Sequence, residues 1–354
     1  MTDLRAALLR QIRAQGPISV AEYMTQCLLH PRHGYYATRD PLGQAGDFTT
    51  APEISQVFGE LLGLQIAQVW MDQGAPSHFA LAELGPGRGT LMADILRATA
   101  RVPGFHDALS LHLVEASAPL RAAQASRLAQ FQPVWHDSAD TLPDQPLYLI
   151  ANEFFDALPI RQFLRQGNGW AERMVGAEGD TLCFGLSPAV PLDALTHRLD
   201  DTSDGQIVET RAPAEPVMEA ISTRIMAHGG YALIVDYGDW RSRGDTLQAL
   251  RAHRFDDPLA HPGAADLTAH VDFEALAQAA RPLRAMALTV QGALLERLGI
   301  TARTHALAQG LSGQPLADHL AAHRRLTHPD EMGHLFKALG LTHPHAPAPP
   351  GFDA

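Results

Sequence analysis

Apolar and polar positions form alternating blocks in the middle of the chain. Short, nearly continuous apolar runs predict buried strands at residues 79–84, 109–114, 134–136 and 147–151. Segments with apolar residues at helical spacing separate these runs and predict helices at about 90–100 and 119–130. Strands that alternate with helices are typical of a parallel sheet with right-handed crossover connections. The pattern therefore predicts an α/β fold with a mostly parallel sheet.

The pattern changes on both sides of this block. Before it, helical spacing predicts helices at about 4–14, 20–29 and 54–72. The second of these helices has a candidate capping box, in which Ser19 is followed three residues later by Glu22. After the block, short apolar segments are joined by glycine-containing turns that are typical of β-hairpins, at about 160–165, 170–175 and 181–185. We therefore expect an antiparallel insertion at about 160–212.

The last third of the chain contains both the apolar runs of strands and the apolar spacing of helices. It predicts, in order, a helix at 213–227, a buried strand at 231–235, and a mixture of helices with one more strand at 284–290. The segment 342–350 is rich in proline and is expected to form a mobile tail.

The first predicted strand ends in a glycine-rich turn, Glu83-Leu-Gly-Pro-Gly-Arg-Gly89. Gly85, Gly87 and Gly89 let the backbone turn sharply and approach a ligand, and the helix that follows directs unpaired N–H groups to the same place. The spacing differs from the G-x-G-x-x-G of dinucleotide binders, and the acidic Glu83 suits a cationic or amino-acid-bearing ligand better than a pyrophosphate. The turn is similar to that of class I S-adenosylmethionine-dependent methyltransferases. A strand–helix turn without a ligand is the alternative.

The ends of the other strands carry polar residues where open α/β sheets bind ligands. Glu115 follows the second strand and can accept hydrogen bonds from both hydroxyl groups of a ribose. Asp137 and Ser138 follow the third strand, where a short polar side chain can bind an adenine amino group. Asn152 follows the fourth strand and can bind the amino-acid part of the cofactor. Each of these side chains could instead be a helix cap or a solvated group.

Two carboxylates, Glu153 and Asp156, stand directly after the fourth strand beside two phenylalanines. Together they could hold a cationic nucleophile, whereas Asp156 could otherwise cap a turn and the phenylalanines could belong to the core. A polar loop before the helix at 54–72 is either a connector or a lid, because loops often carry functional residues. Its candidate residues are Gly46, Asp47, Phe48, Thr49, Thr50 and Glu53.

The composition of the chain excludes several classes of protein and of binding partner. The 354 residues are 46% hydrophobic and 19% charged, which is ordinary for a globular protein. The formal net charge of −12 opposes binding to a polyphosphate, so we expect no nucleic-acid partner. Cys27 and Cys183 provide neither a disulfide framework nor a zinc site, and we interpret the 18 histidines as solvated or core residues. No apolar run reaches about 18 residues, so we expect no membrane span.

Several longer motifs, taken in order, resemble one family. They are Gly46-Asp-Phe-Thr-Thr-Ala-Pro-Glu53, Phe58-Gly-Glu-Leu-Leu62, Glu83-Leu-Gly-Pro-Gly-Arg-Gly-Thr-Leu91, Asn152-Glu-Phe-Phe-Asp-Ala-Leu-Pro159, Val235-Asp-Tyr-Gly238, Gly263-Ala-Ala-Asp-Leu-Thr-Ala-His-Val-Asp-Phe273 and Gln291-Gly292. Together they look like the MidA-like family of S-adenosylmethionine-dependent methyltransferases, over residues 18–340. The departure that stands out is Glu115-Ala-Ser117, where an acidic residue followed by Thr or Ser and then Ser is more usual.

The resemblance implies an organisation and a function. It implies a methyltransferase domain at 76–340 with the insertion at 160–212, an N-terminal helical extension with the active-site loop at 1–75, and the tail at 341–354. Mitochondrial members of the family act in the assembly of respiratory complex I and are taken to methylate an arginine of a core subunit. The resemblance thus implies a protein substrate such as a respiratory-chain subunit, and it allows a homodimer. We expect a cytoplasmic, bacterial-type chain, since the short N-terminus lacks a mitochondrial leader.

The resemblance and the polar residues at the strand ends together predict roles within the site. The cofactor is expected to be S-adenosyl-L-methionine, with no metal ion. We expect it to be bound by Glu83, Gly85, Pro86, Gly87, Gly89, Glu115, Asp137, Ser138 and Asn152, while Gly46 to Glu53 closes over it. Glu153 and Asp156 are expected to grip a guanidinium group as catalytic residues. The alternatives are a cofactor-binding docking protein with little catalysis and, less well supported, a base methyltransferase or a dehydrogenase.

Overall fold

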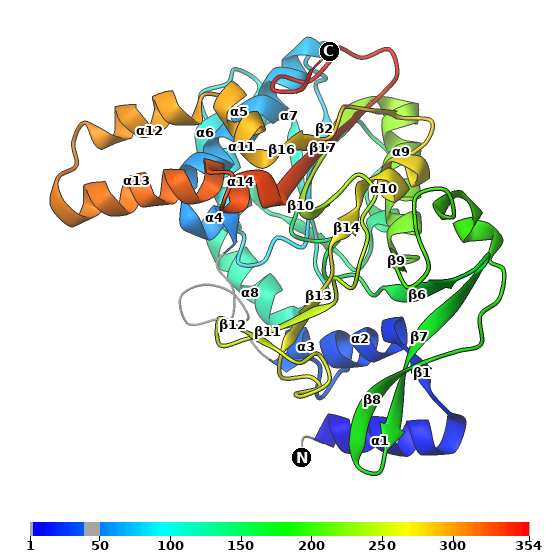
Figure 1. Ribbon diagram of the computed structural model, residues 1–354. Helices are drawn as coiled ribbons and strands as arrows, with labels where there is room; N and C mark the ends of the chain where they lie inside the picture. Colours follow the sequence, from blue (N-terminus) through cyan, green and yellow to red (C-terminus); the bar gives the residue numbers. More distant parts are fainter. Residues whose placement is uncertain (1–2, 39–49, 354) are drawn as a thin grey trace. The chain divides into compact units, whose positions relative to one another are not determined.

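The computed structural model in Figure 1 describes residues 3–38 and 50–353. The chain forms two compact units, each assembled from separate segments. The core unit comprises Thr49–Phe155, Glu215–Trp240 and Phe273–Ala354, and the accessory unit comprises Met1–Phe48, Asp156–Ala214 and Arg241–Asp272. The helices within the first 38 residues therefore belong to the same unit as the antiparallel insertion. This division differs from the boundaries that we expected from the sequence, because strand pairing joins segments that are far apart along the chain.

The core unit is built on a sheet with the strand order β15-β17-β10-β5-β2-β3-β4. Its strands are β2 Phe79–Leu84, β3 Leu109–Val114, β4 Val134–His136, β5 Leu147–Asn152, β10 Gly230–Asp239, β15 Arg284–Ala285, β16 Thr289–Val290 and β17 Phe336–Thr342. The five strands β4, β3, β2, β5 and β10 run parallel, and β17 runs antiparallel to β10. Every residue of β2 and β5 is buried, as expected for parallel strands that are covered on both faces. The predicted α/β fold class is confirmed.

The sequence patterns located the parallel strands but missed the last one. The strand β17 lies between β10 and β15, and it was expected to be part of a mixed helical region. The single strand expected at 284–290 is instead two short strands, β15 and β16, which both pair with β17. The expectation of a mobile tail was wrong, because Phe352 packs into the core and the Gln65 side chain donates a hydrogen bond to the carbonyl of Pro350 at 2.6 Å.

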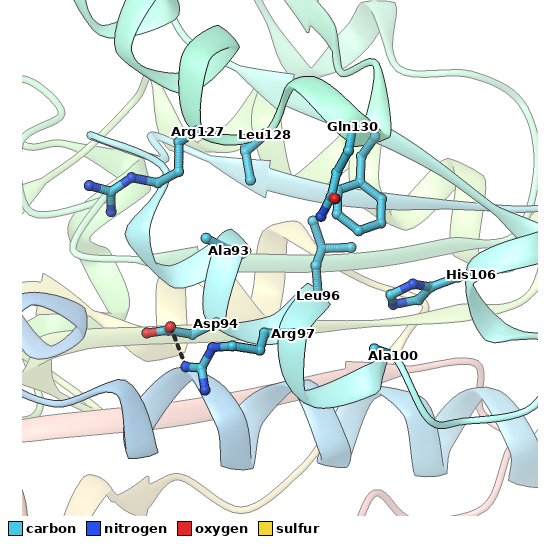
Figure 2. Close-up of a pocket in the computed structure, with 10 residues that line it drawn as sticks. Ala93, Asp94, Leu96, Arg97, Ala100, His106, Arg127, Leu128 and Gln130 are labelled. Atoms are coloured by element: carbon cyan, nitrogen blue, oxygen red, sulfur yellow. Dashed lines mark hydrogen bonds and ion pairs between the residues drawn. The ribbon is translucent and has the colours of Figure 1, made fainter.

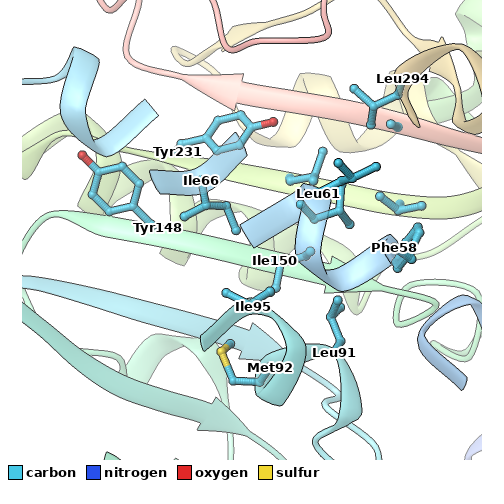
Figure 3. Close-up of a cluster of buried hydrophobic side chains, with 14 of the residues drawn as sticks. Phe58, Leu61, Ile66, Leu91, Met92, Ile95, Tyr148, Ile150, Tyr231 and Leu294 are labelled. Atoms are coloured by element: carbon cyan, nitrogen blue, oxygen red, sulfur yellow. The ribbon is translucent and has the colours of Figure 1, made fainter. Parts of the chain in front are cut away.

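Helices complete the core unit. They are α4 Ala51–Ile54, α5 Gln56–Asp72, α6 Thr90–Thr99, α7 Phe105–Ala108, α8 Ala118–Arg127, α9 Ala214–His228, α10 Phe273–Ala279, α11 Gln291–Arg297, α12 Ile300–Ala308, α13 Gly313–Thr327 and α14 Met332–Leu335, with 3₁₀ turns at Ala129–Phe131 and Ala139–Thr141. Figure 3 shows side chains from α5, α6, β5 and β10 packed into one buried cluster. Each large apolar side chain buried there stabilises the fold by roughly 1.5–3 kcal/mol.

Two glycines let α5 and α6 approach each other closely. A Cβ atom on Gly59 would lie 2.6 Å from the Cβ of Asp94, and one on Gly63 would lie 2.8 Å from the Cα of Ile95. Because Gly59 and Gly63 are four residues apart, they lie on the same face of α5. This close contact fixes α6, the helix that follows the glycine-rich turn.

The accessory unit is mainly antiparallel. Its sheet has the order β1-β7-β6-β9, with β8 paired to β7. Its elements are α1 Asp3–Gln15, β1 Ile18–Ser19, α2 Val20–Leu29, α3 Tyr35–Thr38, β6 Arg161–Gln166, β7 Gly169–Glu178, β8 Thr181–Leu186, a 3₁₀ turn at Asp193–Arg198, β9 Ile207–Thr210, β11 Gln248–Arg251, β12 Arg254–Asp256, β13 Asp266–Thr268 and β14 Val271–Asp272. The predicted hairpins are confirmed, whereas the small sheet β12-β11-β13 was not expected. In the described part of the chain, no helix combines the length and apolarity needed to cross a membrane.

Candidate functional site

The parallel strands of the core unit end at the same edge of the sheet. The last residues of β2, β3 and β4 are in register, since Leu84 pairs with Val114 and Val114 pairs with His136. On the other side of β2, Leu84 pairs with Ala151 of β5. The residues that follow these ends were predicted from the sequence to bind a ligand. The sheet therefore brings Gly85, Glu115, Asp137 and Asn152 to one edge.

The turn between β2 and α6 needs its glycines. Gly85, Gly87 and Gly89 have φ values of +60°, +55° and +75°, which side chains other than glycine rarely adopt. A Cβ on Gly85 would also lie 2.9 Å from Cδ2 of Phe154. Gly89 is the N-cap residue of α6, so the first N–H groups of that ten-residue helix lie directly after the turn. The backbone here can approach a ligand closely.

Two buried polar atoms near this turn have no partner among the described residues. They are Oε2 of Glu83, a side chain only 3% exposed, and Oδ1 of Asn152. Burial, together with the charge of Glu115, raises the pKa of Glu83 to about 8. An unpaired buried acceptor costs free energy, so both atoms are suited to a ligand that brings hydrogen-bond donors or positive charge.

Glu115 is buried at the end of β3, and its carboxylate is held by two hydrogen bonds. The backbone N–H of Ser117 donates to Oε1 at 2.7 Å, and the side-chain amide of Gln124 donates to Oε2 at 3.2 Å. Burial raises the pKa of Glu115, whereas these two hydrogen bonds lower it. A carboxylate has about four acceptor positions, so Glu115 keeps capacity for further donors.

Asp137 and Ser138 lie at the end of β4 as expected, but both side chains already have partners. The Arg121 guanidinium donates to Oδ1 of Asp137 at 2.5 Å, and the Ser138 hydroxyl donates to the carboxylate of Asp140. The Asp137 side chain is 90% exposed, so this ion pair contributes little to stability. The sequence alone did not indicate either partner.

Glu153 adopts an unusual backbone conformation directly after β5. Its φ is +51°, which is strained for a residue with a side chain and costs of order 1–3 kcal/mol. Its Oε1 accepts hydrogen bonds from the backbone N–H of Ala51 at 3.2 Å and from the amide of Asn152 at 3.1 Å. Asp236, a buried residue that sequence reasoning did not single out, accepts a hydrogen bond from the N–H of Phe155 at 3.1 Å. Strain held in place by such contacts is a frequent mark of functional positions.

Asp156 belongs to the accessory unit, where it is 5% exposed. Its carbonyl accepts a hydrogen bond from the N–H of Ala269 at 3.0 Å. The nearby Tyr36 hydroxyl donates to Asp266 at 3.1 Å, and the pKa of Tyr36 is raised well above its ordinary value by burial and then by the charges of Asp266 and Asp156. Tyr36 and Asp266 were not predicted as site residues, although Asp266 lies in one of the motifs that carry the family resemblance.

The predicted lid is described only at its end. Gly46, Asp47, Phe48 and Thr49 lie outside the described residues. Thr50 is the N-cap residue of α4, and Glu53 on that helix accepts a hydrogen bond from the Thr90 hydroxyl at 2.6 Å. Because Thr90 is the first residue of α6, Glu53 is tied to the helix that follows the glycine turn.

A surface hollow lies between α6 and α8 and contains none of the predicted site residues (Figure 2). It is about 660 Å³ in volume and is lined by Ala93, Asp94, Leu96, Arg97, Ala100, His106, Arg127, Leu128, Gln130 and Phe131. Its charged groups already have partners: Arg97 donates to Asp94 at 2.6 Å, and Arg127 donates to the Thr90 hydroxyl. We therefore place the candidate site at the glycine turn and not in this hollow.

A family model described as "Putative S-adenosyl-L-methionine-dependent methyltransferase" matches residues 61–292. The chain belongs to this methyltransferase family. It is 37% identical to the mouse "Protein arginine methyltransferase NDUFAF7, mitochondrial", over 98% of this chain and 85% of that protein. The homologue in Drosophila melanogaster is 35% identical, over 95% and 84%.

A solved structure from Burkholderia thailandensis extends the comparison to three dimensions. That protein, described as a "likely methyl transferase" and bound to S-adenosyl-homocysteine, superposes with a TM-score of 0.80 at 27% identity, covering 99% of this chain and 92% of that one. The methyltransferase described here uses S-adenosyl-L-methionine as its cofactor. The unpaired acceptors of Glu83 and Asn152 fit this cofactor, because it carries an ammonium group and a positive sulfonium.

Proposed function

We propose that this methyltransferase transfers a methyl group to an arginine side chain of a partner protein. The observation that carries the proposal is the likeness to the arginine methyltransferase relatives, which extends over 98% of the chain at 37% identity. A respiratory-chain subunit as the partner, a homodimer and a cytoplasmic location all stay predictions. The mitochondrial names of the relatives support the first of these.

We assign the cofactor contacts from the geometry of the sheet edge. The backbone of Gly85, Pro86, Gly87 and Gly89 would pass along the cofactor, and Glu115 would accept hydrogen bonds from the ribose hydroxyls. Asp137 and Ser138 would lie beside the adenine. The free acceptors of Glu83 and Asn152 would face the amino-acid part, where an ammonium group can satisfy them. The lid assignment of residues 46–53 also stays a prediction.

When bound, the cofactor supplies a methyl group activated by a neighbouring sulfonium. The protein then has to orient the acceptor nitrogen and exclude water. An arginine side chain is charged at all ordinary pH values, so its lone pair is delocalised. A carboxylate that accepts two of its N–H groups localises the charge and leaves a third nitrogen free to react. Transfer would form the N–CH3 bond, break the S–CH3 bond to leave S-adenosylhomocysteine, and release one proton from the methylated nitrogen. Glu153 is suited to this task because hydrogen bonds to Oε1 hold its side chain in place, and we assign Asp156 as the second carboxylate.

The test uses methyl-labelled S-adenosyl-L-methionine and a protein extract as the source of substrate. We expect the wild-type protein to place label in methylarginine, identified after acid hydrolysis. Glu153→Gln and Asp156→Asn should each lower incorporation by about 100-fold or more, the range for loss of an electrostatic contact to the reacting group, while cofactor affinity is retained. Asp180→Asn is a matched control, because Asp180 is a surface carboxylate of the accessory unit with a 75% exposed side chain.

The outcomes separate the proposal from its alternatives. Label in lysine, in nucleic acid or in a small molecule would overturn the arginine assignment. A wild-type protein that binds the cofactor but labels nothing would favour a docking protein with little catalysis. Normal incorporation by both Glu153→Gln and Asp156→Asn would refute the roles of these two carboxylates.

A further inference from the structure

Gln124 occupies a core position in α8, a helix whose other side chains are mostly exposed. In α8, the side chains of Leu120 and Gln124 are the buried ones, and Gln124 is completely inaccessible to solvent. An apolar residue is usual at such a position, since burying an amide without partners costs a few kcal/mol. The side chain must therefore be accounted for by its contacts.

Gln124 makes three hydrogen bonds to three different elements. Its Nε2 donates to the carbonyl of Gly87 at 2.7 Å and to Oε2 of Glu115 at 3.2 Å. Its Oε1 accepts a hydrogen bond from the indole Nε1 of Trp135 at 2.8 Å. An indole N–H can only donate, and a carbonyl and a carboxylate can only accept, so the orientation of the amide is determined by its neighbours.

These contacts join two parts of the proposed cofactor site. One partner is the backbone of the glycine turn, and the other is the carboxylate that we assign to the ribose. The Gly89 position shows how closely α8 approaches the turn, because a Cβ there would lie 3.3 Å from Cδ1 of Leu128 and 3.6 Å from Cγ of Gln124. A fully satisfied buried network of this kind holds its members in one arrangement.

The hydrogen bond that Gln124 donates to Glu115 favours the binding of a ribose by that carboxylate. Two ribose hydroxyls can donate to a carboxylate only if it is ionised and its free lone pairs face them. Burial works against ionisation of Glu115, and the donated hydrogen bond from Gln124 works in favour of it. The same bond fixes Oε2 relative to Gly87, so rotation of the carboxylate would break a contact at a buried site.

We propose that Gln124 is a positioning residue for the cofactor: oriented by Trp135, it holds the Glu115 carboxylate against the glycine turn so that Glu115 can bind both ribose hydroxyls. This inference rests on the proposed cofactor contacts. Gln124 touches no reacting atom and acts through Glu115. Trp135 contributes by presenting its N–H to the amide oxygen, which leaves both amide hydrogens for Gly87 and Glu115.

The test measures binding of S-adenosylhomocysteine and of its 2′-deoxyribose analogue by calorimetry. Gln124→Met keeps the volume and removes the amide, and Trp135→Phe keeps an aromatic ring and removes the N–H. Gln291→Met is the matched control, because Gln291 is 1% exposed and donates a single hydrogen bond to the carbonyl of Leu326 at 3.0 Å. Thermal unfolding of each variant shows how much stability the substitution costs.

We expect Gln124→Met to bind S-adenosylhomocysteine about tenfold more weakly, the change for loss of one hydrogen bond to a charged group. Its preference for the ribose over the deoxyribose compound should fall toward that of Glu115→Gln. Trp135→Phe should change both quantities in the same direction by a smaller factor, and Gln291→Met should leave the preference intact. A merely structural role would lower affinity for both compounds equally.

Three results would overturn the inference, each in a different way. If Gln124→Met keeps the wild-type preference for ribose, or matches Gln291→Met, then Gln124 does not act through Glu115, while the cofactor site itself stands. If the wild-type protein binds neither compound, the proposed cofactor contacts fail and the inference fails with them. If Glu115→Gln alone keeps the preference, the ribose assignment of Glu115 is wrong.

Discussion

The buried carboxyl of Glu83 should make the stability of the cofactor-free protein fall as pH rises. Burial and the charge of Glu115 raise its pKa from 4.5 to about 8. Between these values the folded protein keeps a proton on Glu83 that the unfolded chain has released. The unfolded state then binds fewer protons, so the free energy of unfolding decreases with pH across this window. Replacing Glu83 with glutamine, which resembles the protonated carboxyl, should remove this loss.

The magnitude follows from the two pKa values. Each pH unit across the window costs ~1.4 kcal/mol, so the penalty from Glu83 grows by about 4 kcal/mol between pH 5 and pH 9. Urea unfolding of wild type and Glu83→Gln at both pH values measures it, since other titrating groups cancel in the difference. We expect the stability gained by Glu83→Gln to be several kcal/mol larger at pH 9. S-adenosyl-L-methionine at saturation should reduce the effect, because positive charge beside Glu83 lowers its pKa.

A second buried glutamate provides the control. Glu60 is 5% exposed, and although burial alone would raise its pKa, hydrogen bonds from Arg303 and Arg97 lower it below 4.5. Glu60 is therefore ionised in both the folded and the unfolded state from pH 5 to pH 9, and the stability change in Glu60→Gln should not depend on pH in that range. If the Glu83→Gln difference is equally flat, or if it shrinks as pH rises, then Glu83 is ionised in the folded protein and the reasoning fails.

Two further predictions concern the sheet and its helices. His112 is buried on β3, and its pKa is lowered to about 4 by burial and then by the charge of a neighbouring histidine. Below pH 6.5 the unfolded chain therefore binds more protons than the folded protein. The free energy of unfolding should then fall with acidification, by about 2 kcal/mol between pH 7 and pH 5. His112→Gln should flatten this fall in urea unfolding, and an unchanged slope would contradict the assignment. Gly63→Val should destabilise the core unit by about 1–3 kcal/mol or more, because the added atoms meet the Ile95 backbone. The change is measured as a shift in melting temperature. A melting temperature within 1 °C of wild type, roughly the resolution of the measurement, would contradict the close packing of α5 and α6.

The parallel core could be predicted because its strands are buried on both faces. Such strands appear in the sequence as short continuous apolar runs, and the runs at 79–84 and 147–151 correspond to β2 and β5. The strand β17 could not be found in this way. It contains Gly340 in its middle, and its partner β10 lies about a hundred residues earlier in the chain. The glycine is required by packing, since a Cβ there would lie 3.0 Å from Phe352 and 3.1 Å from Met286.

Some residues of the candidate site could likewise be predicted from the sequence, and others could not. Glu83, Glu115 and Asn152 could be located from the sequence because ligands of open α/β sheets bind where parallel strands end, and the register confirms that these ends coincide. Their roles stay predictions. Gln124 could not be recognised, because one amide in a mostly exposed helix has no sequence signature until its partners at positions 87, 115 and 135 are known. The strained backbone of Glu153 likewise depends on tertiary contacts.

The antiparallel pairing of β17 with β10 has a consequence for biosynthesis. Chains are made from the N-terminus, so β10 emerges from the ribosome long before Phe336–Thr342 exists to pair with it. During that interval β5 pairs with one side of β10, but β17 is still missing from the other side, where it will pair with the mostly apolar residues 231–237. The nascent chain should therefore be most prone to aggregation, and most dependent on chaperones, while the segment from α10 to α14 is being translated.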